Sequence, residues 1–160
     1  MNIVVIGQKG SGKTEIAKLL SRRLNRRLVS TTDELEKKIK SDKEKYIKKF
    51  GLEKYMEVLS ETIENICKHE DGIIDTAEEV VLRKENVNNL KSNGLIILLT
   101  ADPKTIASRI MKTQPAEKIK ELSYSYDKSI AASDYVVDTS NVDPEEVCEM
   151  IMHYIELELR

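Results

Sequence analysis

The chain has 160 residues, and its 26 Lys and Arg nearly balance its 28 Asp and Glu, which gives a formal net charge of −2. This length suits one buried core, so we expect a single domain over residues 1–160. The balanced charge excludes the basic surface that nucleic acids and anionic membranes require, and we expect neither as a partner.

The sequence carries no signal for export. Met1 to Ile6 contains no basic leader, and no apolar run approaches the roughly 20 residues that span a bilayer. Cys67 and Cys148 lack the close spacing of a metal site and fall in helical patterns, which favours free thiols in a reducing compartment. We therefore expect a cytoplasmic protein, either a monomer or a weak homo-oligomer.

The first half of the chain alternates between strand and helix patterns. Asn2 to Ile6 is a β-branched run typical of a central parallel strand, and a helix with apolar residues at helical spacing begins at Lys13. A second strand is expected near Arg27 to Ser30. Two helical patterns divided near Gly51 follow, and Gly72 to Thr76 is expected to form a third strand.

The second half continues this alternation. Leu95 to Leu99 is the clearest buried strand, and a helix is expected to begin after it at Asp102-Pro103. Tyr135 to Val137 is the last expected strand. Asp143-Pro144 then begins the final helix, with an N-cap residue and a proline in the first turn. This order is typical of an α/β doubly wound fold, and we interpret the lysine-rich stretch Glu36 to Lys49 as a solvated helix face.

The segment between the first strand and the first helix matches the pattern GxxxxGK[ST] of a phosphate-binding loop. Gly7, Gly12, Lys13 and Thr14 fill its defined positions, and Gly10 and Ser11 lie between them. In this motif the backbone amides converge on the phosphates, the lysine reaches the β and γ groups, and the hydroxyl binds Mg²⁺. The strand before the loop and the helix after it are its expected context, so we predict ATP and Mg²⁺ as ligands.

Four stretches of the sequence resemble the shikimate kinase family of small P-loop kinases, and they cover the chain almost from end to end. They are the loop with its helix, Leu28 to Glu36, Gly72 to Thr100, and Ser133 to Val147. The most specific part is Val81 to Asn86 ahead of Leu90 and Gly94. The resemblance implies a three-layer P-loop NTPase fold, with a five-stranded parallel sheet in the order 2-3-1-4-5 flanked by helices, a substrate-binding helical segment after the second strand and a lid before the last.

The resemblance also implies an adenine clamp. The family sandwiches the base between an arginine after the fourth strand and a proline after the fifth, and the matching residues are Arg109 and Pro144. An arginine can stack on a base with cation–π character. The alternatives, a solvated helix arginine and a plain helix start, stay open for each residue taken alone.

The acceptor side departs from the family pattern. Ser30 and Thr32 stand where the family has aspartates, and Ala77-Glu78-Glu79 replaces its triple glycine. Family arginines are missing at several positions: near Met56, around Ser125 or Tyr126, and in the lid, where Met111 to Pro115 is short and holds only Lys112. Arginine forks normally hold a carboxylate, and two extra carboxylates repel one. These departures make shikimate a doubtful acceptor.

Two further acids, Asp75 and Asp33, are candidates for metal binding and for catalysis. Asp75 ends the third expected strand and can hold Mg²⁺ as a Walker B acid, or can cap the following turn. Asp33 can act as the base that orients an acceptor hydroxyl, or can be the N-cap of a helix before Leu35. Both alternatives stay open for each residue.

Three functional hypotheses follow. The first is a kinase of shikimate-kinase type that transfers the γ-phosphoryl group of MgATP to the hydroxyl of an unidentified small molecule, neutral or cationic because of Glu78 and Glu79. The second is an inactive ATP-binding pseudokinase that regulates a partner. The third is a nucleoside-monophosphate kinase, because Asp134 to Val147 is also similar to cytidylate kinases. In the first hypothesis Lys13 and Asp33 are the catalytic residues.

Overall fold

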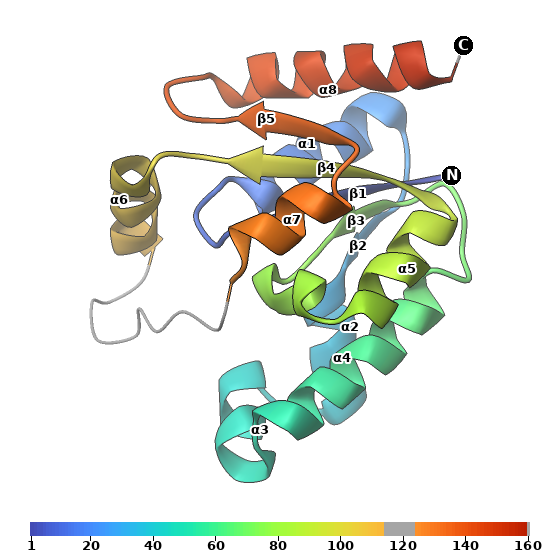
Figure 1. Cartoon of the computed structure of the whole chain (residues 1–160), viewed down its shortest axis with the longest axis vertical. Helices are drawn as coiled ribbons and strands as arrows, with labels where there is room; N and C mark the ends of the chain where they lie inside the picture. Colours follow the sequence, from blue (N-terminus) through green and yellow to red (C-terminus); the bar gives the residue numbers. More distant parts are fainter. Residues whose placement is uncertain (114–123, 160) are drawn as a thin grey trace.

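The computed structural model describes residues 1–113 and 124–159. Its centre is a parallel sheet whose neighbouring strands follow the order β2-β3-β1-β4-β5 (Figure 1). This order and the helices around the sheet confirm the predicted P-loop NTPase fold. The strands are β1 (Asn2–Gly7), β2 (Leu28–Ser30), β3 (Ile73–Asp75), β4 (Gly94–Thr100) and β5 (Tyr135–Asp138). All five strands were predicted, and none of their ends differs by more than one residue.

The sheet buries both of its faces. Successive side chains of a strand point to opposite faces, so Ile3 and Val5 of β1 pack on one side and Val4 and Ile6 on the other. Helices α1 (Lys13–Leu24) and α8 (Pro144–Glu158) cover the first face. The second face lies against α4 (Leu52–Ile66), α5 (Lys84–Ser92) and α7 (Tyr126–Ala132). This double cover explains why the central strands β1 and β4 are almost continuously apolar rather than alternating.

The segment after β2 forms three helices where the sequence indicated two patterns. Helix α2 (Thr31–Ile39) begins at Ser30, whose hydroxyl accepts a hydrogen bond from the Asp33 amide, and it ends at Lys40 in a left-handed conformation. A separate helix α3 (Lys43–Phe50) follows and precedes α4. The stretch from residue 36 to 49 is therefore not one solvated helix face, because its backbone turns between α2 and α3.

Helix α3 is the most peripheral of these helices. It has no buried residue, and Figure 1 shows it at the end of the molecule opposite α8. Asp42 caps its first turn by accepting hydrogen bonds from two backbone amides. Tyr46 and Ile47 pack against the core cluster beside α4. Polar contacts therefore contribute much of what places α3 against the rest of the fold.

Two further helices follow the carboxyl ends of β3 and β4. A 3₁₀ helix η1 (Glu78–Leu82) follows β3, and α6 (Pro103–Thr113) follows β4. The predicted short lid begins within α6, and the remainder of it lies outside the described residues. None of the helices in the described ranges has the length and apolar character to cross a membrane.

Candidate active site

The phosphate loop connects the end of β1 to α1. Three of its residues have positive φ angles, Gly7 (149°), Gly10 (88°) and Gly12 (98°), and non-glycine residues rarely adopt them. A Cβ atom on Gly7 would lie 2.5 Å from the backbone oxygen of Leu99. The loop therefore needs glycine both for its backbone turn and for its close approach to β4.

Lys13 lies over the loop at the start of α1. Its ammonium group donates hydrogen bonds to the backbone oxygens of Gly7 at 2.7 Å and Gln8 at 3.1 Å. Burial lowers the pKa of Lys13 to about 8, although the nearby carboxylates of Asp75, Glu78 and Glu79 act in the opposite direction. The loop thus holds a cation at the place where the motif positions the β and γ phosphates.

Thr14 and Asp75 meet directly. Asp75 ends β3 beside Val5 of β1, and the Thr14 hydroxyl donates a hydrogen bond of 2.8 Å to its carboxylate. Burial raises the pKa of Asp75, and the bond from Thr14 opposes this rise. Hydroxyl and carboxylate oxygens are the ligands that Mg²⁺ prefers, so this pair fits a magnesium ion bound next to the loop.

Thr14 and Asp75 do not by themselves form a complete metal site. Within the described residues there is no group of three or more His, Cys, Asp or Glu placed to hold a metal. Mg²⁺ is usually bound by one or two protein oxygens together with substrate phosphates and water. The geometry of Thr14 and Asp75 therefore suits an ion that arrives with a nucleotide.

Asp33 belongs to α2, the helix that follows β2, and not to the phosphate loop or to β3. It occupies the first turn of α2 with an exposed side chain, and its charge contributes to the raised pKa of Asp75. The cap of α2 is Ser30, so the alternative in which Asp33 is the N-cap is wrong. Its role as a base stays a prediction.

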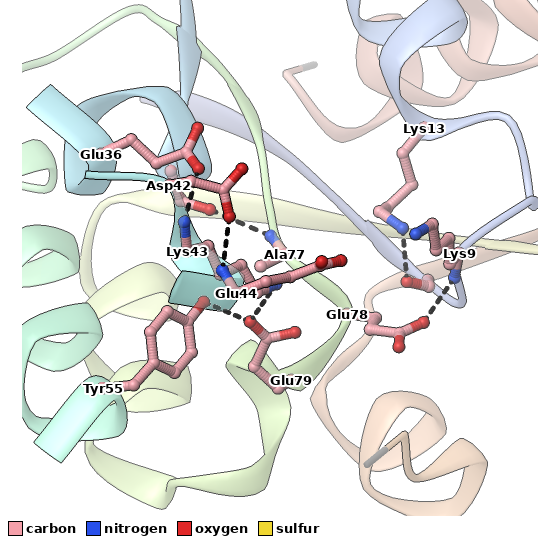
Figure 2. A network of polar contacts seen from close by, with 12 residues as sticks. Lys9, Lys13, Glu36, Asp42, Lys43, Glu44, Tyr55, Ala77, Glu78 and Glu79 are labelled. Atoms are coloured by element: carbon pink, nitrogen blue, oxygen red, sulfur yellow. Dashed lines mark hydrogen bonds and ion pairs between the residues drawn. The ribbon is translucent and has the colours of Figure 1, made fainter. Parts of the chain in front are cut away.

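Glu78 lies against the phosphate loop. The backbone amide of Lys9 donates a hydrogen bond of 2.7 Å to its carboxylate, and the side chain is largely buried. Figure 2 shows Glu78 on the same side of the network as Lys9 and Lys13. One of the two carboxylates that replace the family's glycines therefore contacts the loop itself.

Glu79 points to a different group of residues. Its carboxylate is fully buried, accepts a hydrogen bond from the Tyr55 hydroxyl, and forms an ion pair of 2.7 Å with Lys43 of α3 (Figure 2). Burial and the neighbouring Glu79 raise the pKa of Tyr55. The Lys43 amide also donates a hydrogen bond of 2.8 Å to Glu36. Glu79 thus connects η1, α3 and α4.

Arg109 of α6 holds the other side of the loop. Its guanidinium donates hydrogen bonds to the backbone oxygen of Gly10 at 3.1 Å and to Thr139 at 3.0 and 2.9 Å. Thr139 in turn donates to the backbone oxygen of Ser11 at 2.8 Å. Pro144 lies in the first turn of α8 after the N-cap Asp143. The predicted adenine clamp stays a prediction, and the contacts of Arg109 add a structural role at the loop.

Sequence reasoning did not assign roles to four residues of this region. They are Lys9, Lys43, Tyr55 and Thr139. Lys9 contributes its backbone amide, so the type of its side chain gives no signal for this contact. Tyr55 belongs to the apolar stripe of a predicted helix, and Lys43 is one of many lysines in its segment, so the residue type gives no signal for either contact. Thr139 followed the last strand, where loop residues commonly carry function, and this position was the only available signal.

Comparison with known proteins agrees with this geometry. The shikimate kinase family model matches residues 9–156. A shikimate kinase of Thermodesulfovibrio yellowstonii is 33% identical over 160 residues, covering 94% of this chain and 92% of that protein. One from Caldicellulosiruptor saccharolyticus is 40% identical over 109 residues, covering 68% and 63% of the two chains.

Solved structures show the same fold. A shikimate kinase from Acinetobacter baumannii in complex with shikimate superposes with a TM-score of 0.88 at 17% identity, covering 98% of this chain and 93% of that one. The enzyme from Aquifex aeolicus gives 0.81 at 24% identity, with 99% and 98% covered. Together with the matched family model, the phosphate loop and the order of the sheet, these likenesses place the chain in the shikimate kinase family, as an ATP-dependent kinase with a hydroxyl acceptor.

Proposed function

We propose that this kinase transfers the γ-phosphoryl group of magnesium-bound ATP to the hydroxyl of a small molecule other than shikimate, one that is neutral or cationic. The observation that carries the nucleotide part is the 2.8 Å contact between Thr14 and Asp75 beside the ammonium group of Lys13. A cation and two oxygens of the kind that bind magnesium, side by side at the phosphate loop, support this part of the proposal.

Catalysis in this proposal is mainly electrostatic. Lys13 and the loop amides stabilise the negative charge that spreads over the transferring oxygens. The magnesium ion, when bound, neutralises charge on the β and γ phosphates, and Thr14 with Asp75 would hold it. Arg109 keeps the loop in shape through Gly10 and Thr139, in addition to its predicted contact with adenine.

The acceptor part rests on Glu78. Its carboxylate accepts a hydrogen bond from the loop amide of Lys9, and it stands in the place of the family's triple glycine. A carboxylate acceptor such as shikimate would meet a like charge there, and Met56 offers no guanidinium to hold it. A neutral or cationic alcohol meets no such repulsion.

The proposal is tested by measuring ATP turnover with magnesium against shikimate, nucleoside monophosphates, sugars, amino alcohols and no acceptor. We expect stimulation by a neutral or cationic alcohol and loss of turnover in Lys13→Ala, whose fold stays intact. Stimulation by shikimate would refute the acceptor part. Tight ATP binding without turnover would favour the regulatory pseudokinase, and stimulation by a nucleoside monophosphate would favour the third hypothesis.

A further inference from the structure

Glu78 and Glu79 are adjacent in sequence but belong to different environments. Both lie at the start of η1, and neighbouring residues of a 3₁₀ helix point about 120° apart. Figure 2 shows Glu79 directed toward Tyr55 and Lys43, and Glu78 directed toward Lys9 and Lys13. Glu79 is therefore engaged in holding α3 and α4, whereas Glu78 faces the phosphate loop.

The position of Glu78 is fixed from the loop side. The Lys9 amide donates a 2.7 Å hydrogen bond to one carboxylate oxygen, and the residue is 8% exposed. Its charge is also one of those that act most strongly on Lys13. The carboxylate thus lies beside the phosphate loop, near the lysine that the motif assigns to the β and γ phosphates.

We propose that Glu78 is the general base of the phosphoryl transfer, an inference that rests on the proposed function. The acceptor hydroxyl oxygen forms a bond to the γ-phosphorus while the bond from phosphorus to the β-γ bridging oxygen breaks. The bridging oxygen keeps that electron pair and leaves as part of ADP. The hydroxyl proton moves to the Glu78 carboxylate and passes to solvent after the phosphate ester departs.

Glu78 meets the requirements of this role better than the other acids at this edge. Asp33 is exposed in the first turn of α2, whereas Glu78 contacts the loop. Asp75 accepts the hydrogen bond of Thr14 and is in place for magnesium. A base must reach the hydroxyl that attacks the γ-phosphate, and contact with the loop at Lys9 gives Glu78 this reach.

The test compares Glu78→Gln with its matched neighbour Glu79→Gln, in the presence of the alcohol that best stimulates wild type and with water alone as acceptor. Turnover and ATP affinity are measured separately, the latter by calorimetry. We expect Glu78→Gln to lose at least ~100-fold in turnover, within the usual contribution of a general base. Its ATP affinity should be unchanged or tighter, because a negative charge beside the phosphates is removed. Glu79→Gln should lose stability but keep its turnover per folded molecule.

Each outcome bears on the proposal. Turnover of Glu78→Gln within about threefold of wild type would overturn it, as would loss of turnover in Asp33→Asn with Glu78→Gln unaffected. Should Glu78→Gln fail to fold, Glu78→Asp decides, since it keeps the carboxylate but withdraws it from the loop and should retain ATP binding with slower turnover. Absence of turnover in wild type would overturn the proposed function together with this inference, whereas the first two outcomes overturn the inference alone.

Discussion

Lys43 and Glu79 form an ion pair of 2.7 Å across the boundary between α3 and the end of the sheet. The Glu79 side chain is fully buried, and that of Lys43 is 19% exposed. The Tyr55 hydroxyl donates to the same carboxylate oxygen that contacts Lys43, while the second oxygen has no hydrogen-bond partner among the described residues. The buried charge of Glu79 therefore depends on a lysine from an otherwise peripheral helix.

Removal of Lys43 should be costly for stability. Lys43→Met leaves Glu79 buried without its cation, and breaking a buried pair in this way usually costs about 3–5 kcal/mol. We expect urea unfolding to show a loss in that range, and the double variant Lys43→Met with Glu79→Gln to recover most of it. Lys38→Met is the matched control, because its ion pair with Glu61 is exposed to solvent and should contribute little to stability. Equal losses in the two lysine variants would contradict the finding.

Gly7→Ala should distort the phosphate loop. Its Cβ would lie 2.5 Å from the Leu99 oxygen and 2.8 Å from the Ser11 hydroxyl, so the backbone must shift. We expect a loss of stability of about 2–4 kcal/mol and weaker ATP binding, from steric overlap together with backbone strain. Gly51→Ala separates the two effects, because its φ is 90° and nothing lies within 4 Å of the added atom. It should cost about 1–3 kcal/mol from backbone strain alone and leave ATP binding unchanged, so a Gly7 variant no worse than this in stability and ATP binding would refute the prediction.

The protein should take up a proton when it binds ATP above pH 8. The pKa of Lys13 is lowered to about 8, so the ammonium is present below that pH and lost above it in the nucleotide-free protein. Phosphates favour the charged form and raise this pKa when they bind. Affinity should therefore fall as the pH rises through 8, with more than about half a proton taken up at pH 8.5 and little at pH 7. Calorimetry in buffers of different ionisation enthalpy measures this uptake, and Lys13→Arg, which stays charged, should show none.

Arg109→Ala should weaken binding of ATP and of inorganic triphosphate alike. The contacts of Arg109 are with Gly10 of the loop and with Thr139, so its removal should loosen the loop itself. We expect roughly a tenfold rise in Kd for both ligands, equivalent to about 1.4 kcal/mol. Arg109→Lys should not restore affinity, because a lysine lacks the fork geometry of the guanidinium. A loss confined to ATP would instead indicate that stacking on adenine is the main role of Arg109.

The strands and the phosphate loop were predictable because their signals are local. Val4 and Val5 belong to a β-branched run that two covering layers require, and Gly7 to Thr14 carries a motif whose spacing reflects one turn around a phosphate. The break between α2 and α3 was missed, because it depends on a left-handed Lys40. Lysine is not typical of that conformation, so residue type gave no signal for it.

The sequence by itself determined the class of fold, the family and the position of the phosphate loop, since apolar periodicity and a glycine motif act over a few neighbouring residues. Only the tertiary structure decided which of the two adjacent carboxylates, Glu78 or Glu79, lies at the loop. That choice depends on the turn of η1 and on the arrival of Lys43 and Tyr55 from distant segments. A buried charge is stable only where a partner reaches it, and the partner of Glu79 is 36 residues away along the chain, a contact that no local pattern records.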